Sequence, residues 1–117
     1  MENKEFARQL EQRTRKFAIN IIGLSSDLPG NPESLVVRNQ LTKSGTSIGA
    51  NYREANRAKS RADFINRIKI CESEASETQY WLSIITDTDW LLPEKLQSIR
   101  NECNELLAIF TAIGKNK

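Results

Sequence analysis

The side chains of this chain that could do chemistry are carboxylates and small polar groups, and they lie in two segments. Ser44, Ser47, Asn51 and Glu54 recur at spacings of three, four and three, so they line one stripe of a helix. A Glu-x-x-Glu pair begins further on, at Glu74. Paired carboxylates can act as general acid and base. Small polar side chains beside an apolar stripe instead suggest a tightly packed, hydrogen-bonded interface.

The composition restricts the chemistry that these groups can perform. The 117-residue chain contains no histidine, which excludes Ser-His-Asp triads and Glu-x-x-His metal motifs. The Glu-x-x-Glu pair alone is too common on helices to indicate a two-metal site, and there is no glycine-rich phosphate loop. Gly45 and Gly49 lie four residues apart, a spacing that favours close approach of two helices. We therefore expect no enzymatic activity, no cofactor and no metal.

A structural ion-pair network is the favoured interpretation of the charged residues. Arg13 falls at a core-facing position of its expected helix, and a charge near a core is costly unless it is paired and hydrogen-bonded. We expect Arg13 to bridge Glu54 or Glu74 across helices, with serine and asparagine side chains satisfying the remaining donors and acceptors. The predicted structural polar network consists of Arg13, Ser44, Ser47, Asn51, Glu54 and Glu74.

Four helical segments must position these side chains. Proline-containing breaks at residues 28–32 and 89–93 and a capping signal at Ser60 predict helices over about 4–24, 32–56, 61–87 and 92–113. The first helix places Phe6, Leu10, Arg13, Phe17, Ile21 and Leu24 on one face. The third has the stripe Phe64, Ile68, Cys71, Ala75, Thr78, Leu82 and Ile85. The fourth has the stripe Leu92, Leu96, Ile99, Cys103, Leu106, Phe110 and Ile113.

The alternating spacing of four and three in the last two helices describes helices that cross at shallow angles. Four such helices with short loops predict an all-α protein. The fold class is an antiparallel up-down-up-down four-helix bundle, with a single domain over residues 1–117.

Some apolar residues lie outside these stripes. The possible oligomer interface consists of Ile19, Ile22, Ile70, Trp81 and Ile84, which a lone small bundle has no second core to bury. Self-association is the favoured interpretation. Local packing of Trp81 and Ile19 against the end loops is the alternative.

Charge is distributed unevenly, although the net charge is only +2. Residues 28–62 hold six basic and two acidic residues, whereas residues 63–90 hold two basic and six acidic ones. A solvated face is the ordinary explanation. The functional one is a polar molecule or a head-to-tail assembly with a basic surface. The possible nucleic-acid contacts, which could neutralise phosphates, are Lys43, Arg53, Arg57, Lys59 and Arg61. Because Tyr52 faces the core stripe, few aromatic residues remain for base stacking, and binding would be independent of sequence.

The two cysteines and the hydropathy pattern favour a cytoplasmic location for the protein. Cys71 and Cys103 fall on apolar stripe positions, so we expect reduced thiols in the core. The N-terminal segment is too charged for a signal peptide, and no apolar run approaches the 18 residues of a membrane span. We expect a cytoplasmic protein with no membrane contact and no small-molecule substrate.

Several motifs resemble one known family over nearly the whole chain. They are Arg13-Thr14-x-x-Phe17-Ala18, Leu28-Pro29, Gln40-Leu41-x-x-Ser44-Gly45-Thr46-Ser47-Ile48-Gly49-Ala50-Asn51-Tyr52-Arg53-Glu54-Ala55, Ser60-x-x-Asp63-Phe64 and Glu74-Ala75-x-Glu77-Thr78-x-x-Trp81-Leu82. With them the chain resembles the proteins named after open reading frames in 23S ribosomal RNA intervening sequences, also labelled S23 ribosomal proteins. The resemblance implies a four-helix bundle that often assembles as a ring-like homopentamer. Structurally similar bundles include the accessory protein of diversity-generating retroelements, a basic pentameric barrel that binds nucleic acid and a reverse transcriptase.

Two functions remain open from the sequence. The favoured one is a non-enzymatic homo-oligomer, with a pentamer preferred, that binds RNA or DNA through its basic surface. The alternative is a protein-binding scaffold or accessory subunit with no nucleic-acid contact.

Overall fold

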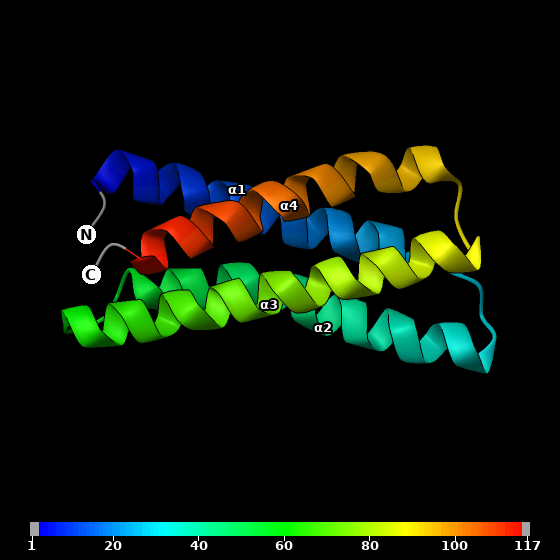
Figure 1. Ribbon diagram of the computed structural model, residues 1–117, viewed down its shortest axis with the longest axis horizontal. Helices are drawn as coiled ribbons and strands as arrows, with labels where there is room; N and C mark the ends of the chain where they lie inside the picture. The colour runs from blue at the N-terminus through cyan, green and yellow to red at the C-terminus, as the bar shows by residue number, and fades with distance from the viewer. Residues whose placement is uncertain (1–2, 116–117) are drawn as a thin grey trace.

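The computed structural model describes residues 3–115, and these residues form four helices. They are α1 (Lys4–Ser26), α2 (Pro32–Ala55), α3 (Arg61–Thr88) and α4 (Pro93–Lys115). Consecutive helices run in opposite directions, so the α2–α3 turn lies at the same end as both chain termini (Figure 1). Each helix packs against its neighbours in the sequence, and α4 closes the bundle against α1. The antiparallel four-helix bundle is therefore confirmed, with a long axis of 45 Å.

Local capping residues fix where three of the helices begin. The Asn3 side chain accepts a hydrogen bond from the Phe6 backbone N–H, and Asn31 accepts one from Ser34. The predicted cap at Ser60 is confirmed, because its hydroxyl oxygen accepts a hydrogen bond from the Asp63 N–H at 3.0 Å. Each such cap satisfies a backbone donor that has no partner within the helix.

The core forms where the apolar stripes meet. All seven residues of the predicted α3 stripe are buried. In α4, Leu96, Cys103, Leu106 and Phe110 are buried, whereas Leu92 is exposed because the helix begins after it, at Pro93. The ring of Tyr52 meets Phe110 edge-on at 5.5 Å between centroids, which joins α2 to α4 across the core.

One core position in α1 differs from the prediction. Thr14 is fully buried, and Arg13 lies at the edge of the core. With Thr14 in place of Arg13, the stripe Leu10, Thr14, Phe17, Ile21 keeps the alternating four-three spacing of the other helices. The buried Thr14 hydroxyl is satisfied because it donates to the backbone carbonyl of Glu11.

Gly45 and Gly49 bring α2 close to α1, as their spacing predicts. A Cβ atom added at Gly45 would lie only 2.8 Å from Cγ2 of Ile21. One added at Gly49 would lie 3.1 Å from the hydroxyl oxygen of Thr14. Gly45 therefore leaves no room for a side chain at the packing distance that the two helices adopt, and Gly49 leaves little.

Candidate functional site

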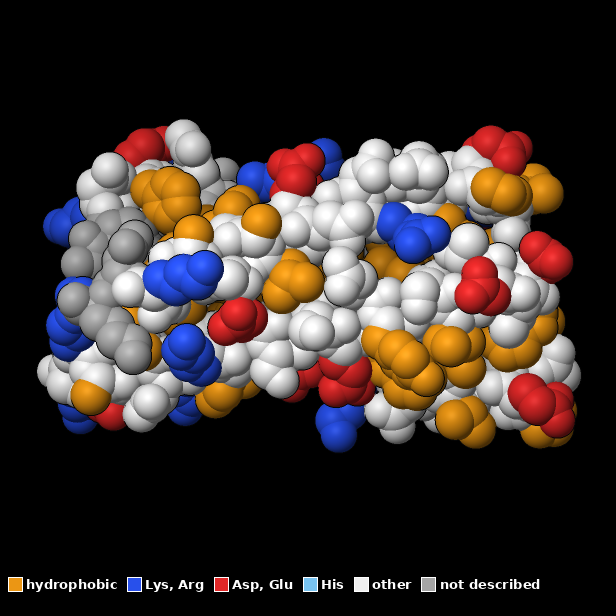
Figure 2. Space-filling model, viewed as in Figure 1, with side chains coloured by type: hydrophobic (Ala, Val, Ile, Leu, Met, Phe, Trp, Pro, Cys, Tyr) orange, Lys and Arg blue, Asp and Glu red, His pale blue; other side chains and the backbone are white. Residues whose placement is uncertain are grey.

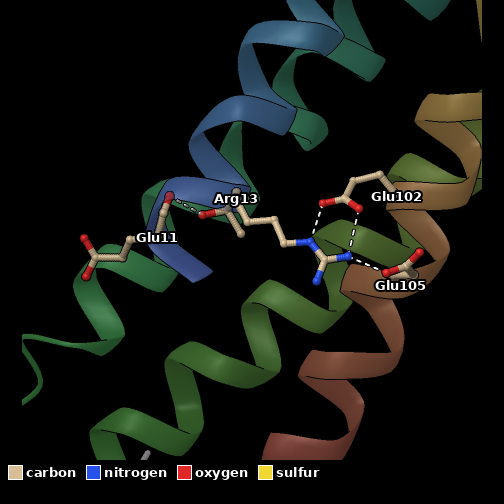
Figure 3. A network of polar contacts seen from close by, with 5 residues as sticks. Glu11, Arg13, Glu102 and Glu105 are labelled. Atoms are coloured by element: carbon tan, nitrogen blue, oxygen red, sulfur yellow. Dashed lines mark hydrogen bonds and ion pairs between the residues drawn. The ribbon is translucent and has the colours of Figure 1, made fainter. Parts of the chain in front are cut away.

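Arg13 forms the most extensive ion-pair cluster of the described chain, with two carboxylates of α4. Its Nε lies 2.5 Å from Oε2 of Glu102, its Nη2 lies 2.8 Å from Oε1 of the same residue, and Nη2 also lies 2.5 Å from Oε1 of Glu105. Figure 3 shows the guanidinium reaching from α1 to both carboxylates, while the Glu11 side chain points the opposite way. Hydrogen bonding to Glu102 raises the pKa of Arg13, so the guanidinium stays protonated.

The predicted bridge from Arg13 to Glu54 or Glu74 is wrong. Because Thr14 occupies the core position, Arg13 is turned toward α4, away from α2 and α3. Its side chain remains 36% exposed, and that of Glu102 remains 30% exposed, so the cluster is a surface seam. Glu54 is exposed on α2.

The small polar residues of the predicted network instead bond to nearby backbone carbonyls and to side chains of α3. The Ser44 hydroxyl is buried and lies 2.9 Å from that of Thr78, which joins α2 to α3 inside the core. Ser47 donates to the Lys43 backbone carbonyl. Asn51 donates to the Ser47 backbone carbonyl and accepts from Arg67 of α3. The six predicted residues therefore do not form one network.

Glu74 is half-buried on α3. Burial raises the pKa of this carboxyl, the neighbouring Glu77 carboxylate raises it further, and the positive charge of Lys43 opposes the shift. Glu77 accepts a hydrogen bond from the indole N–H of Trp81 at 3.1 Å. No group of three metal-ligating side chains occurs among residues 3–115.

The predicted basic residues fall in two places. Arg53 and Arg57 lie near the end of α2, and Lys59 and Arg61 follow at the turn into α3. Lys43 lies ten residues before Arg53, about 15 Å away along the helix, beside a different hollow. Figure 2 shows lysine and arginine side chains gathered toward the end with the α2–α3 turn, and acidic side chains at the other end.

A cation that the sequence did not indicate joins this group. Arg15 of α1 lines the same hollow as Arg53 of α2 and as Arg57, which follows that helix. The antiparallel contact between Thr14 and Gly49 places Arg15 near the level of Gly49, one helical turn before Arg53. Pairing the α1 stripe through Thr14 with the glycine spacing of α2 is the signal that could have revealed Arg15.

The predicted interface residues lie on two separate helices that do not contact one another. Ile19 and Ile22 of α1 are 55% and 50% exposed. On α3, Ile70 is exposed, whereas Trp81 and Ile84 are half-buried against the core. Figure 2 shows a further hydrophobic cluster over the first part of α2 and the second half of α3, where Val36 and Tyr80 are also exposed.

Both thiols serve the core, as predicted. Cys71 and Cys103 are free, fully buried and donate to backbone carbonyls on neighbouring helices. Burial raises the pKa of each thiol to about 12. They are therefore protonated and unreactive at neutral pH.

Fold and polar geometry together define a small all-α bundle protein with surface ion pairs and a segregated basic end. No helix in residues 3–115 combines the length and apolarity needed to cross a bilayer. The chain belongs to the 23S rRNA-intervening sequence protein family, whose sequence model matches residues 7–112.

A solved structure agrees with this assignment. The chain is similar to a crystal structure of a protein of unknown function from the S23 ribosomal protein family of Bacteroides thetaiotaomicron. The two share 40% sequence identity with a TM-score of 0.84, over 91% of this chain and 98% of the other. No protein with a curated description matches the chain. The resemblance noted from the motifs is thereby confirmed, and the family's fold is shared.

Proposed function

We propose that this protein is a non-enzymatic homo-oligomer, a cytoplasmic pentameric ring, that binds RNA or DNA without sequence preference. The basic end of the bundle is the observation that supports it most. Arg53, Arg57 and Lys59 are exposed there, and none of them forms an ion pair with another described residue. Unpaired cations on one surface can neutralise successive phosphates and release counterions.

The distribution of apolar surface favours a ring. In a cyclic assembly of more than two subunits, each protomer uses two different patches, because the contacts are head-to-tail. The exposed isoleucines of α1 and the hydrophobic cluster over α2 and α3 supply two such patches on different sides of the bundle. A dimer with twofold symmetry needs only one patch.

The polar side chains favour binding over catalysis. Glu102 and Glu105 are engaged by Arg13, and Glu77 is engaged by Trp81. The Ser44 hydroxyl is sealed inside the core beside Thr78. Two buried, unpaired thiols also fit the reducing conditions of the cytoplasm.

Light scattering coupled to size-exclusion chromatography tests the assembly. We expect a mass about five times the 13.3 kDa of the chain. A monomer at micromolar concentration would overturn the oligomer proposal.

A salt series tests the nucleic-acid proposal. We expect binding to duplex DNA and structured RNA that weakens steeply with salt. Combining Arg57→Glu with Arg61→Glu should reduce the salt slope, whereas combining Arg38→Glu with Lys95→Glu, toward the opposite end, should not. An unchanged slope in the first variant would mean that another surface binds.

A protein-binding scaffold is the second candidate, favoured by the hydrophobic cluster over the first part of α2 and the second half of α3. Exposed apolar patches of this kind mark partner surfaces. Absence of binding to both nucleic acids at low salt would favour this candidate.

A further inference from the structure

A groove between α1 and α2 is lined by three arginines, one from α1, one from α2 and one from the turn that follows α2. The groove has a volume of about 490 Å³. Arg15 of α1 lines one side. Arg53 of α2 and Arg57, which follows the C-cap of α2, line the other.

Short side chains keep the groove open. Its lining includes Gly49, Ala50 and Ala18, and none of these can fill the space between the arginines. Gly49 also lets α1 approach α2 closely, which sets the distance between Arg15 and the arginines on the other side. The hollow and its charged walls therefore depend on the same packing contact.

The groove is electropositive. Arg15, Arg53 and Arg57 form no ion pair with any residue in the described range 3–115. The one carboxylate that lines the groove, Glu11, accepts a hydrogen bond from the side-chain amide of Asn56 at 2.8 Å. Three guanidinium groups against one engaged carboxylate leave an excess of positive charge that a bound anion would neutralise.

The lining favours one class of anion. A guanidinium fork matches the oxygens of a phosphate group and can bind it with two parallel hydrogen bonds. No aromatic side chain lines the groove, and single-strand binding proteins rely on aromatic stacking. No large apolar pocket is present either, and peptide-binding grooves need one for an anchor side chain.

We propose that this arginine groove binds the phosphodiester backbone of double-stranded nucleic acid without reading its bases. The inference rests on the proposed nucleic-acid binding and deepens it, because it adds α1 and Arg15 to the contact surface. Phosphates of one strand enter the groove, while the basic turn at Lys59 and Arg61 contacts the duplex beside it.

Fluorescence anisotropy with short RNA and DNA duplexes of the same sequence tests the groove directly. We expect Arg15→Gln to weaken binding to both duplexes and to lower the magnitude of the salt slope by about 1. Lys16→Gln is the matched control, because it removes one charge from the adjacent position, which lines the separate α1–α4 hollow. The proposal is overturned if the two variants bind alike. Binding of one duplex alone would still support the groove and identify its source as RNA or DNA.

Two further variants test the groove without removing a cation. Ala50→Leu should fill part of the groove and weaken duplex binding. Ala108→Leu, at an exposed position of α4, should not weaken it. Glu11→Gln should strengthen binding, because it removes the groove's negative charge while keeping an oxygen for Asn56. Circular dichroism and particle mass confirm that each variant folds and assembles. Duplex binding unaffected by Ala50→Leu would overturn the proposal.

The outcomes separate this inference from the proposed function. If reversing Arg57 and Arg61 weakens duplex binding but Arg15→Gln and Ala50→Leu do not, the groove proposal fails and the basic end remains. If the wild-type protein binds neither duplex at low salt, nucleic-acid binding fails as a whole. If polyglutamate displaces the labelled duplex as effectively as unlabelled duplex does, the groove binds an acidic protein instead, and the proposal is overturned.

Discussion

Arg13 connects the first and last helices of the bundle at its surface, where one guanidinium meets two carboxylates. Exposed ion pairs contribute little, because water and salt screen them. The paired hydrogen bonds to Glu102 and the additional bond to Glu105 place this cluster above an ordinary surface pair. We expect the cluster to help close α4 onto α1, the least extensively packed pair of neighbouring helices.

Replacing Arg13 by methionine tests this contribution. With over a third of the side chain exposed, we expect Arg13→Met to lower the free energy of unfolding by only about 1 kcal/mol at low salt. The loss should shrink in about 1 M NaCl as the pair is screened. Urea denaturation at both salt concentrations measures it.

Arg8→Met is the control, because Arg8 pairs with Glu5 on the same helix and both side chains are more exposed. Its effect should be smaller than that of Arg13→Met. Equal effects of the two substitutions, or a loss that grows with salt, would contradict the assigned role of Arg13.

The residue scale also shows why the partner of Arg13 could not be predicted. The sequence indicates that an arginine beside the core needs a carboxylate, but several helices offer one. The choice depends on whether Arg13 or Thr14 faces inward, a difference of one residue or about 100° of helix rotation. The hydroxyl–hydroxyl contact of Ser44 with Thr78 likewise requires knowing which faces of α2 and α3 meet.

Among the elements, α1 and α2 show how glycine sets the distance between helices. A Cβ at Gly45 would meet Cγ2 and Cγ1 of Ile21 at 2.8 and 2.9 Å. Ile21 is fully buried and branched at Cβ, so its side chain has little freedom to move aside. Overpacking of this kind usually outweighs the better helix propensity of alanine.

Two glycine substitutions should therefore change stability in opposite directions. We expect Gly45→Ala to lower the free energy of unfolding by about 1 kcal/mol, the balance of overpacking against helix propensity. Gly23→Ala should raise it by about 0.5–1 kcal/mol, because nothing lies within 4 Å of the added Cβ and the helix gains propensity. Thermal or urea unfolding of the two variants beside the wild type measures both signs. A stabilising Gly45→Ala would show that α1 and α2 can separate without cost.

The helices and their bounds were the part of the structure that the sequence predicted best. The breaks at Pro32 and Pro93 and the cap at Ser60 are local signals that depend on few residues, and the helix bounds follow them closely. The seven-residue stripe of α3 is buried in full because its period matches the packing. The arginine groove escaped prediction since Arg15 and Arg53 are far apart in the sequence and meet only once α1 pairs with α2.

For the whole molecule, charge is separated along the bundle. Cations gather toward the end with the α2–α3 turn, and the opposite end is acidic (Figure 2). The uneven charge of the second and third helices in the sequence thus becomes an axial separation, because the turn between them brings the basic residues to one end. This separation gives a bound polyanion a single preferred end and keeps it from the acidic one.

The two buried thiols report on unfolding of the whole bundle. Cys71 lies on α3 and Cys103 on α4, and both are inaccessible, so a thiol reagent can reach them only when the bundle opens. Burial in the folded bundle raises each pKa to about 12, above the ordinary value of 9.0 of a thiol in the unfolded chain. Between these two pH values the unfolded chain binds fewer protons than the native one, so stability falls as pH rises.

We expect each thiol to lower the free energy of unfolding by up to about 1.4 kcal/mol per pH unit in this range. Below pH 9 the native and unfolded thiols are both protonated, and their stabilising contribution is complete.

Urea denaturation from pH 8 upward should show this decline in the free energy of unfolding of the wild type. A variant combining Cys71→Ala with Cys103→Ala should show a shallower one, even if it is less stable at neutral pH. Lysine and tyrosine ionisation affects both proteins alike, so the difference in slope isolates the thiols. Parallel pH profiles would mean that the thiols ionise within the folded bundle, and that its core admits water at α3 and α4.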